Sequence, residues 1–289
     1  MGRLSILAAN AINRISARMP PGLGRWLRNR TWPSKHPTLH YLEFHIADHC
    51  NMNCGGCLHF APYAPRWFAD AADVEKDFSR LKALFGNIRH VRVMGGEPLL
   101  HPECARFLGI VRDAFRDSCI ELVTNGLLLE KQDGDFWEVC RRTNATISLS
   151  VYPPVKPLLP KLHELCRRKN VPLYATPSET FMARYVPDGS VDAVKSFRHC
   201  RGEAFFCPIL RKGRIYKCAM GCYARFWNDV SPHPFPPEEG LSLETADGPA
   251  ILDYLMRPMP ACAYCSPEAR LFQWRRGEPK LEDWLKQEP

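Results

Sequence analysis

Three cysteines that lie close together are the residues best suited to chemistry in this chain. Cys50, Cys54 and Cys57 stand in the segment HCNMNCGGC, separated by three and then by two residues. The spacing lets three thiolates of one short loop converge on a metal centre, and Gly55 and Gly56 allow the backbone to wrap tightly around the sulfurs. A [4Fe–4S] cluster with three cysteine ligands keeps one iron open, much as a catalytic zinc site keeps one position for substrate. The loop therefore predicts an open iron–sulfur centre.

The last third of the chain holds a second group of cysteines. Cys207 and Cys218 flank a segment that predicts a hairpin with its turn at Lys212–Gly213, so both thiols should meet at the base of the hairpin. Cys262 and Cys265 form a CX2C pair, the most recurrent metal-binding spacing. Two pairs give a closed site with four thiolates. Both a [4Fe–4S] cluster and a zinc ribbon satisfy that ligand set.

The other cysteines divide into two groups. Cys200 and Cys222 lie near the second set. Three roles are open for them: a spare metal ligand, a hydrogen-atom donor or a small apolar packing residue. The remaining four are interpreted as core packing, because they follow apolar residues at helical spacing or begin a strand: Cys104, Cys119, Cys140 and Cys166.

Strand-like and helix-like segments alternate from residue 41 onward, which predicts βα units around a parallel sheet or barrel. The predicted strands are 41–46, 89–94, 119–124, 145–151 and 171–175, and the predicted helices are 73–86, 102–116, 134–142 and 157–169. The three-cysteine loop follows the first strand, and the segment Met94–Pro98 ends the second. Strand ends are where a β/α barrel presents its ligands.

Polar and apolar residues alternate along these strands. In 145–151, Thr146, Ser148 and Ser150 share one face, and apolar residues occupy the other. If helices cover the apolar face, the polar face lines a lumen that suits a polar ligand. The residues expected on that inner face are Glu43, His45, Arg92, Ser148 and Ser150. The alternative is a set of strands half exposed to water.

These motifs, in this order, resemble the radical S-adenosylmethionine (radical SAM) superfamily. Its signature is three cysteines spaced CX3CX2C after the first strand, and Gly95-Gly96-Glu97 matches the motif that holds the amino group of SAM. Thr124-Asn125-Gly126 is common in the SPASM/twitch subgroup, and the strand with Ser148 and Ser150 matches the ribose-contacting strand. The resemblance covers about residues 41–175. It implies a SAM-binding [4Fe–4S] cluster on Cys50, Cys54 and Cys57, and SAM contacts from Gly95, Gly96, Glu97, Asn125, Ser148 and Ser150.

The same resemblance implies the fold and the second metal centre. The fold expected is an α/β partial (β/α)6-type barrel with a small cysteine-rich C-terminal α+β domain. The C-terminal cysteines resemble those of a twitch domain, which implies that Cys207, Cys218, Cys262 and Cys265 bind an auxiliary [4Fe–4S] cluster. One position departs from the family. The aromatic residue that commonly precedes the third cysteine and helps to seat adenine is Gly56 here, and His59 and Phe60 are the candidates to replace it.

Charge and composition divide the chain into three regions. The chain has a net charge of +8. Most of the surplus positive charge lies in a basic tail (1–37), because no acidic residue precedes Glu43. Its apolar residues recur at helical spacing, which suits an anionic membrane surface, a partner protein or the underside of the core. The barrel is expected at 38–195 and the auxiliary domain at 196–289. A nearly neutral body argues against nucleic-acid binding, and thirteen cysteines without a secretory signal indicate a cytoplasmic protein with no membrane span.

The predicted activity follows from the resemblance. A radical SAM enzyme would cleave SAM with one electron from a donor such as flavodoxin or ferredoxin, then abstract hydrogen from substrate. A sugar, a cyclitol or a nucleotide-linked carbohydrate suits the polar inner face, with oxidation or epimerisation as the outcome. Epimerisation needs a hydrogen donor, for which Cys200 or Cys222 is available. The alternatives are a maturase of ribosomally made peptides and, in another class, a non-catalytic iron–sulfur scaffold or redox sensor.

Overall fold

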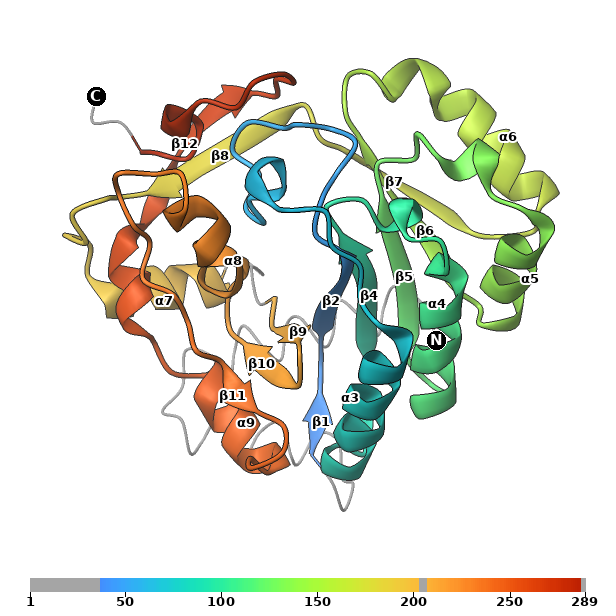
Figure 1. Ribbon diagram of the computed structural model, residues 1–289, viewed down its shortest axis with the longest axis horizontal. Helices are drawn as coiled ribbons and strands as arrows, with labels where there is room; N and C mark the ends of the chain where they lie inside the picture. Colours follow the sequence, from blue (N-terminus) through green and yellow to red (C-terminus); the bar gives the residue numbers. More distant parts are fainter. Residues whose placement is uncertain (1–36, 203–206, 287–289) are drawn as a thin grey trace.

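The computed structural model describes residues 37–202 and 207–286, so the predicted basic tail lies outside them except for Pro37. An eight-stranded sheet has the order β11-β10-β9-β2-β4-β5-β6-β7, and its neighbours from β9 to β7 pair in parallel. Helices α3 to α6 cover one side of this open half-barrel (Figure 1). The predicted α/β partial barrel is confirmed.

The bounds of the elements are as follows. The strands are β1 (Thr38–Leu39), β2 (Leu42–Ala47), β3 (Asn87–Ile88), β4 (His90–Gly95), β5 (Cys119–Thr124), β6 (Thr146–Val151), β7 (Leu173–Pro177), β8 (Thr180–Tyr185), β9 (Ile209–Arg211), β10 (Arg214–Tyr216), β11 (Leu241–Ser242) and β12 (Cys265–Gln273). The helices are α3 (Ala71–Leu84), α4 (Cys104–Ala114), α5 (Gly134–Arg142), α6 (Leu159–Arg168), α7 (Ala193–Gly202), α8 (Ala219–Asn228) and α9 (Gly248–Leu255). Each strand and helix predicted between residues 41 and 175 corresponds to one of these elements.

Two helices of the cysteine-rich region, α7 and α8, were not predicted. In α8 the residues Met220, Tyr223, Phe226 and Trp227 are all buried, together with the small residues between them. A helix that is buried on most of its surface shows no apolar stripe with a period of 3.6 residues. The pattern that identified the earlier helices is therefore missing here.

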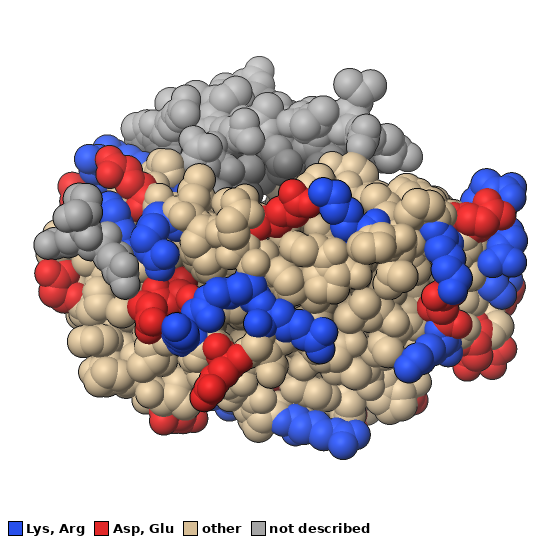
Figure 2. Space-filling view, turned by 90° about the horizontal axis from the view of Figure 1, so that it is seen from above, with Lys and Arg blue, Asp and Glu red and all other residues tan. Residues whose placement is uncertain are grey.

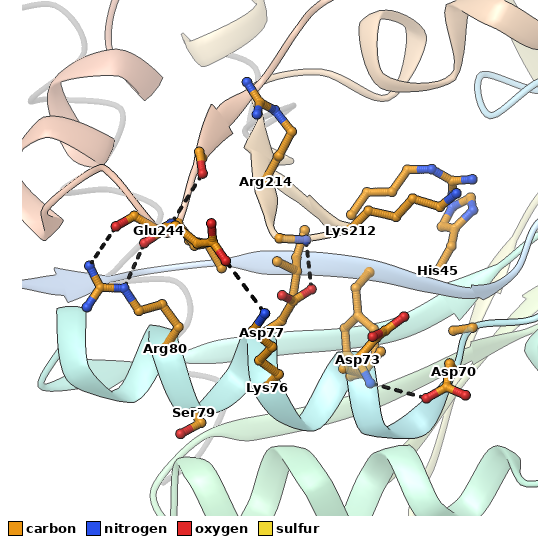
Figure 3. A pocket seen from close by; sticks show the side chains of 18 of the residues that line it. His45, Asp70, Asp73, Lys76, Asp77, Ser79, Arg80, Lys212, Arg214 and Glu244 are labelled. Atoms are coloured by element: carbon orange, nitrogen blue, oxygen red, sulfur yellow. Dashed lines mark hydrogen bonds and ion pairs between the residues drawn. The ribbon is translucent and has the colours of Figure 1, made fainter.

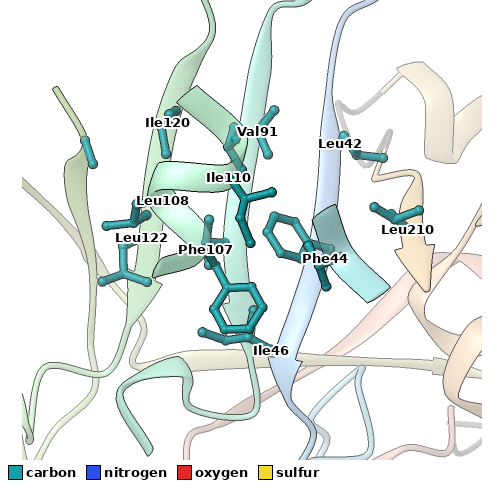
Figure 4. Packing of buried hydrophobic residues seen from close by; sticks show 14 of the residues in the cluster. Leu42, Phe44, Ile46, Val91, Phe107, Leu108, Ile110, Ile120, Leu122 and Leu210 are labelled. Atoms are coloured by element: carbon teal, nitrogen blue, oxygen red, sulfur yellow. The ribbon is translucent and has the colours of Figure 1, made fainter. Parts of the chain in front are cut away.

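The main core lies between the sheet and the helices. Asp70 caps α3 by accepting hydrogen bonds from the backbone N–H groups of Ala72 and Asp73. The predicted stripe of α3 then brings Phe78 against Phe44 of β2, with ring centroids 5.1 Å apart. Figure 4 shows the same face of the sheet, where Phe44, Val91 and Leu122 point toward α4. Because alternate residues of each strand fill this core, the others must face the inside of the half-barrel.

The predicted hairpin adds two strands to the edge of the sheet. Lys212 (φ 46°) and Gly213 (φ 71°) form its turn, with the two left-handed residues that a tight two-residue hairpin favours. Strand β9 pairs in parallel with β2, with Leu210 opposite Phe44. Strands from both sides of the predicted boundary at residue 195 therefore belong to one sheet.

A second small sheet of β8 and β12 crosses the carboxyl ends of the barrel strands (Figure 1). Below it lies an aromatic cluster that includes Phe60, Tyr185, Trp227 and Trp284, all almost fully buried. Phe60 follows the cysteine loop, whereas the other three come from the second half of the chain. This cluster packs the C-terminal region against the loop.

None of the helices in the described part of the chain is long and apolar enough to span a bilayer. On the face drawn in Figure 2, acidic and basic side chains are interspersed, and neither sign forms an extended field. That distribution agrees with the nearly neutral body inferred from the sequence.

Candidate functional site

The cysteine loop leaves the carboxyl end of β2 and is held there by the end of β4. The N–H of Gly96 donates to the carbonyl of Ala47 (2.8 Å), and the N–H of Glu97 donates to that of His49 (3.1 Å). A Cβ atom on Gly95 would lie 2.2 Å from the Ala47 oxygen, and one on Gly96 would lie 2.4 Å from the His49 oxygen. Both glycines are needed because the two backbones approach so closely.

The third strand end, at β5, reaches the same loop. The Nδ2 atom of Asn125 donates to Oδ1 of Asn51 (2.7 Å) and lies 3.8 Å from the sulfur of Cys50. The predicted SAM-binding residues Gly95, Gly96 and Asn125 thus surround the loop, on strands that are adjacent in the sheet. The structure brings these motifs together, and their contact with SAM stays a prediction.

Glu97 is fully buried and joins the ends of β4 and β5. Its carboxylate accepts hydrogen bonds from the N–H of Leu99 (3.0 Å), the hydroxyl of Thr124 (2.6 Å) and the N–H of Asn125 (2.9 Å). Burial raises the pKa of Glu97 to about 7, although these hydrogen bonds act in the opposite direction. The carboxylate therefore has a structural role in aligning the two strand ends. Its predicted contact with the amino group of SAM is a separate proposal.

Each sulfur of the loop has an N–H donor. The N–H of Met52 donates to Cys50 (3.3 Å), and Nε1 of Trp274 donates to Cys54 (3.1 Å). Burial raises the pKa of all three thiols, that of Cys54 to about 11, whereas N–H groups of the backbone and of Trp274 lower it. A metal ion displaces the thiol proton, and N–H donors then stabilise the thiolate. The donor set fits an iron–sulfur cluster.

A segment distant in sequence forms one wall of this site. We call residues 272–284 the C-terminal segment. The N–H of Gly55 donates to the carbonyl of Arg275 (3.3 Å), and Nε1 of Trp284 donates to the carbonyl of Cys57 (2.8 Å). The indole of Trp274 also stacks on Tyr152, with ring centroids 5.7 Å apart. This wall was not predicted, because more than 200 residues separate it from the loop and no motif marks it in the sequence.

The position that lacks an aromatic residue is filled from the same segment. A Cβ atom on Gly56 (φ 73°) would lie 2.5 Å from Cζ of Phe272. Phe60 is 1% exposed and packs against Trp227 and Trp284, so it is part of the core. His59 packs against His45, with ring centroids 4.7 Å apart. Neither residue takes the place beside Gly56, which Phe272 occupies.

The inner face of the half-barrel is polar, as the alternation predicts. Glu43, His45 and Ser148 are each about 5–6% exposed, whereas Arg92 and Ser150 are only partly buried. Glu43 is paired with Arg92 in register, and Nε of Arg92 donates to Glu121 (2.8 Å). Ser150 lies one step above Ser148 on the same face of β6.

A buried ion pair connects the start of the loop to the hairpin. Both terminal nitrogens of Arg211 donate to the carboxylate of Asp48, at 2.7 and 2.6 Å. Burial alone would raise the pKa of Asp48, but the adjacent imidazole of His45, 3.5 Å away, and the hydrogen-bonded guanidinium of Arg211 outweigh it and lower the pKa to about 2. Since Asp48 lies two residues before Cys50, this pair fixes the direction in which the loop begins.

The four predicted auxiliary ligands line one cavity of about 120 Å³. A fifth cysteine joins them, and the complete set is Cys200, Cys207, Cys218, Cys262 and Cys265. Burial raises the pKa of Cys265 to about 12, and the neighbouring thiol of Cys200 contributes to the shift. Cys222 is not in this cavity. Burial raises its pKa, and the charges of Arg211, Glu238 and Asp48 also act on it, so it lies near the Arg211–Asp48 pair at the start of the first cysteine loop.

A larger groove of about 1060 Å³ separates α3 from the hairpin (Figure 3). Most of its charged side chains form hydrogen bonds or ion pairs with other groups of the protein. The N–H of Gly213 donates to Asp77 (2.9 Å), Arg80 donates to the carbonyl of Leu243 (2.7 Å), and Lys76 pairs with Glu244 (3.5 Å). These contacts hold the hairpin against α3.

Comparison with known proteins gives partial matches. No protein-family model matches the chain. The chain is 35% identical over 97 residues to a GTP 3',8-cyclase of Heliobacterium modesticaldum, covering 32% of this chain and 29% of that protein. A GTP 3',8-cyclase of Acidothermus cellulolyticus is 25% identical over 176 residues, covering 56% and 48%. The chain therefore spans at most about half the length of these relatives.

Among solved structures, the chain is similar to BtrN in complex with AdoMet and 2-DOIA, at a TM-score of 0.47, 11% identity and coverage of 80% and 94%. Another is anSMEcpe with bound AdoMet, at a TM-score of 0.40, 18% identity and coverage of 48% and 43%. The partial matches to the cyclases agree with the resemblance to the radical SAM superfamily that the sequence motifs indicate. The cysteine loop, Gly95–Glu97 and Thr124–Gly126 lie at the carboxyl ends of β2, β4 and β5, and Ser148 and Ser150 lie on β6. The ligand assignments within that site go beyond what these partial matches establish.

Proposed function

We propose that this protein is a radical SAM enzyme whose SAM-binding [4Fe–4S] cluster is held by Cys50, Cys54 and Cys57. The observation that carries the proposal is the convergence of three separate motifs on one loop. Glu97 and Asn125 contact each other across the ends of β4 and β5, and both reach the segment that contains His49, Cys50 and Asn51. Such convergence at the carboxyl ends of parallel strands is typical of a ligand site.

When bound to Cys50, Cys54 and Cys57, the cluster would supply the electron for reductive cleavage of the C5′–S bond of SAM. The residues of this chain would bind the cluster and SAM, orient them and enclose them. The backbone at Gly95 and Gly96 holds the start of the loop, and the C-terminal segment covers its outer side. A covered site excludes water and oxygen from a reactive radical.

We propose that the C-terminal cavity holds an auxiliary [4Fe–4S] cluster rather than zinc. Five cysteines line this cavity of about 120 Å³, whereas a structural zinc ion takes four ligands. The pattern of these cysteines also resembles that of a twitch domain, which supports iron–sulfur. Cys207, Cys218, Cys262 and Cys265 are the proposed ligands, with Cys200 as a neighbour.

The proposed substrate is a small polar molecule, such as a sugar, a cyclitol or a nucleotide-linked carbohydrate. Glu43, Arg92 and Ser148 supply acceptors and donors on the inner face below the loop. The related cyclases are named for GTP, a nucleotide that contains a sugar. For an epimerase, Cys222 is favoured over Cys200 as hydrogen donor, because Cys222 lies toward Arg211 and the first loop, whereas Cys200 lines the auxiliary cavity.

The decisive experiment is anaerobic reconstitution followed by addition of dithionite and SAM. We expect release of 5′-deoxyadenosine by the wild type and none by Cys54→Ala, since this change removes one of three cluster ligands. Cys140→Ala is the matched control, because Cys140 is a buried cysteine of the α5 core. If the reconstituted wild type binds no SAM, the proposal that this protein is a radical SAM enzyme is refuted. Release of 5′-deoxyadenosine would exclude the alternative of a non-catalytic iron–sulfur scaffold.

A further inference from the structure

A second group of metal-ligand side chains lies at the opposite end of the sheet from the cysteine loop. His90 begins β4, and Cys119 and Glu121 lie on β5, with His90 directly opposite Cys119 in the parallel register. One ligand atom from each of the three lies within 4.8 Å of the other two. His90 is separated from Gly95, at the other end of β4, by five residues, or about 17 Å of strand. The group is therefore distinct from the site proposed for SAM.

The structure contradicts the interpretation of Cys119 as a core residue. Cys104, Cys140 and Cys166 belong to the main hydrophobic core, but Cys119 does not and is only partly buried. Along β5 it alternates with the core residues Ile120 and Leu122, so it faces the polar inner side with Glu121. The position at the start of a strand did not reveal which face the thiol would take.

His90 is held close to Glu121 within this group. It is 6% exposed, and its Nε2 atom is fully buried. Nε2 lies 3.2 Å from Oε1 of Glu121, which is the ion-pair partner that the structure gives it. The two ligand atoms are thus already placed side by side, as they would be around a shared ion.

Neighbouring side chains orient two of the three groups. Nε of Arg92 donates to Oε2 of Glu121 (2.8 Å), which leaves Oε1 on the side of His90. The ring of Tyr41 contacts the imidazole of His90 edge-on, with centroids 5.1 Å apart. Hydrogen-bonded carboxylates and fixed imidazole rings are typical of the surroundings of metal ligands.

We propose that His90, Cys119 and Glu121 form a binding site for a divalent transition-metal ion of the zinc class. Imidazole nitrogen, thiolate sulfur and carboxylate oxygen are the three ligand types that zinc uses in proteins, and a water molecule would complete four-fold coordination. The Cys119 thiol releases its proton to solvent when the ion binds. Thiolate and carboxylate then neutralise the two positive charges of the ion. Because the ligands come from adjacent strands, the ion would join β4 to β5.

The test uses the full chain with its iron–sulfur clusters reconstituted anaerobically, then exposed to excess zinc sulfate and desalted. We expect the wild type to retain about one zinc ion per chain more than Cys119→Ala. The control Cys140→Ala should retain as much zinc as the wild type. Iron content measured on the same samples shows whether each variant folds and loads its clusters. Equal zinc in the wild type and Cys119→Ala, at equal iron, would overturn the proposal.

A second variant tests the site without relying on Cys119, and a second readout identifies the ligand atoms. Glu121→Gln preserves the shape of the side chain but removes its charge, and we expect it to lose the same zinc ion. Zinc-edge X-ray absorption of the wild type, after subtraction of the Cys119→Ala spectrum, should show one sulfur among nitrogen and oxygen neighbours. A difference spectrum without sulfur would contradict the assignment.

Discussion

Asp48 is a buried carboxylate with one dominant partner. Its side chain is fully buried, that of Arg211 is 6% exposed, and the two form a bidentate pair. Removal of one partner from such a pair leaves an uncompensated charge. Loss of one partner should therefore lower the free energy of unfolding by more than the intact pair adds to it.

We predict that Arg211→Met lowers the free energy of unfolding by about 3–5 kcal/mol at neutral pH. Urea unfolding of the reconstituted protein, followed by far-ultraviolet circular dichroism, measures the change. Lys212→Met is the control, because Lys212 is exposed in the adjacent turn, and it should change stability by less than about 0.5 kcal/mol. Equal stability of the two variants would contradict the prediction.

The same pair gives a dependence on pH. The pKa of Asp48 is about 2 in the folded protein, below its ordinary value of 3.8. A depressed carboxyl pKa contributes stability above about pH 4, and this contribution is lost as pH falls toward 2. The difference between the wild type and Arg211→Met should therefore narrow over that interval. A constant difference would show that the ion pair is not its cause.

Among the elements, the C-terminal segment has the most direct effect on the proposed cluster. Trp274 donates to the sulfur of Cys54, whereas Trp284 donates to the backbone oxygen of Cys57. Trp274 therefore contacts a proposed metal ligand, whereas Trp284 contacts only the backbone of the loop. Hydrogen bonds to ligand sulfurs raise the reduction potential of an iron–sulfur cluster, because they stabilise the more negative reduced state.

We predict that Trp274→Phe shifts the midpoint potential of the cluster on Cys50, Cys54 and Cys57 to a more negative value. A redox titration monitored by electron paramagnetic resonance measures the shift without any turnover. Trp284→Phe removes an indole N–H from the same segment and should leave the potential unchanged. The same potential in Trp274→Phe and the wild type would refute the role assigned to this hydrogen bond.

The sequence predicted the βα units and their helices well, because stripes such as that of α3 and alternation such as that of β6 reflect local geometry. It also predicted the hairpin from Lys212–Gly213. It did not predict the pairing of β9 with β2, the position of Phe272 at Gly56 or the inward direction of Cys119. Each of these depends on contacts between distant residues or on which face of a strand is covered, and neither leaves a periodic signal in the chain.

At the scale of the whole molecule, the barrel and the cysteine-rich region share one sheet. Leu210 of β9 is 3% exposed and lies in the main core, opposite Phe44 of β2. The edge of β2 would be open without this strand. We therefore infer that the two regions depend on each other for stability.

We predict that Leu210→Ala destabilises the whole protein by about 2–5 kcal/mol, as expected for a large-to-small change in a core. Hydrogen–deuterium exchange should show a matching loss of protection in β2, β4 and β9. Leu271→Ala is the control, because Leu271 is 65% exposed. A loss of protection confined to β9 and β10 would show that the regions unfold separately.

Strand β12 begins with the thiol of Cys265, and the residue that follows its end, Trp274, touches the sulfur of Cys54. The loop at residues 50–57 therefore has a complete outer wall only while residues 272–284 are packed against it. A displacement of β12 that began at Cys265 would reach the first cysteine loop through Trp274.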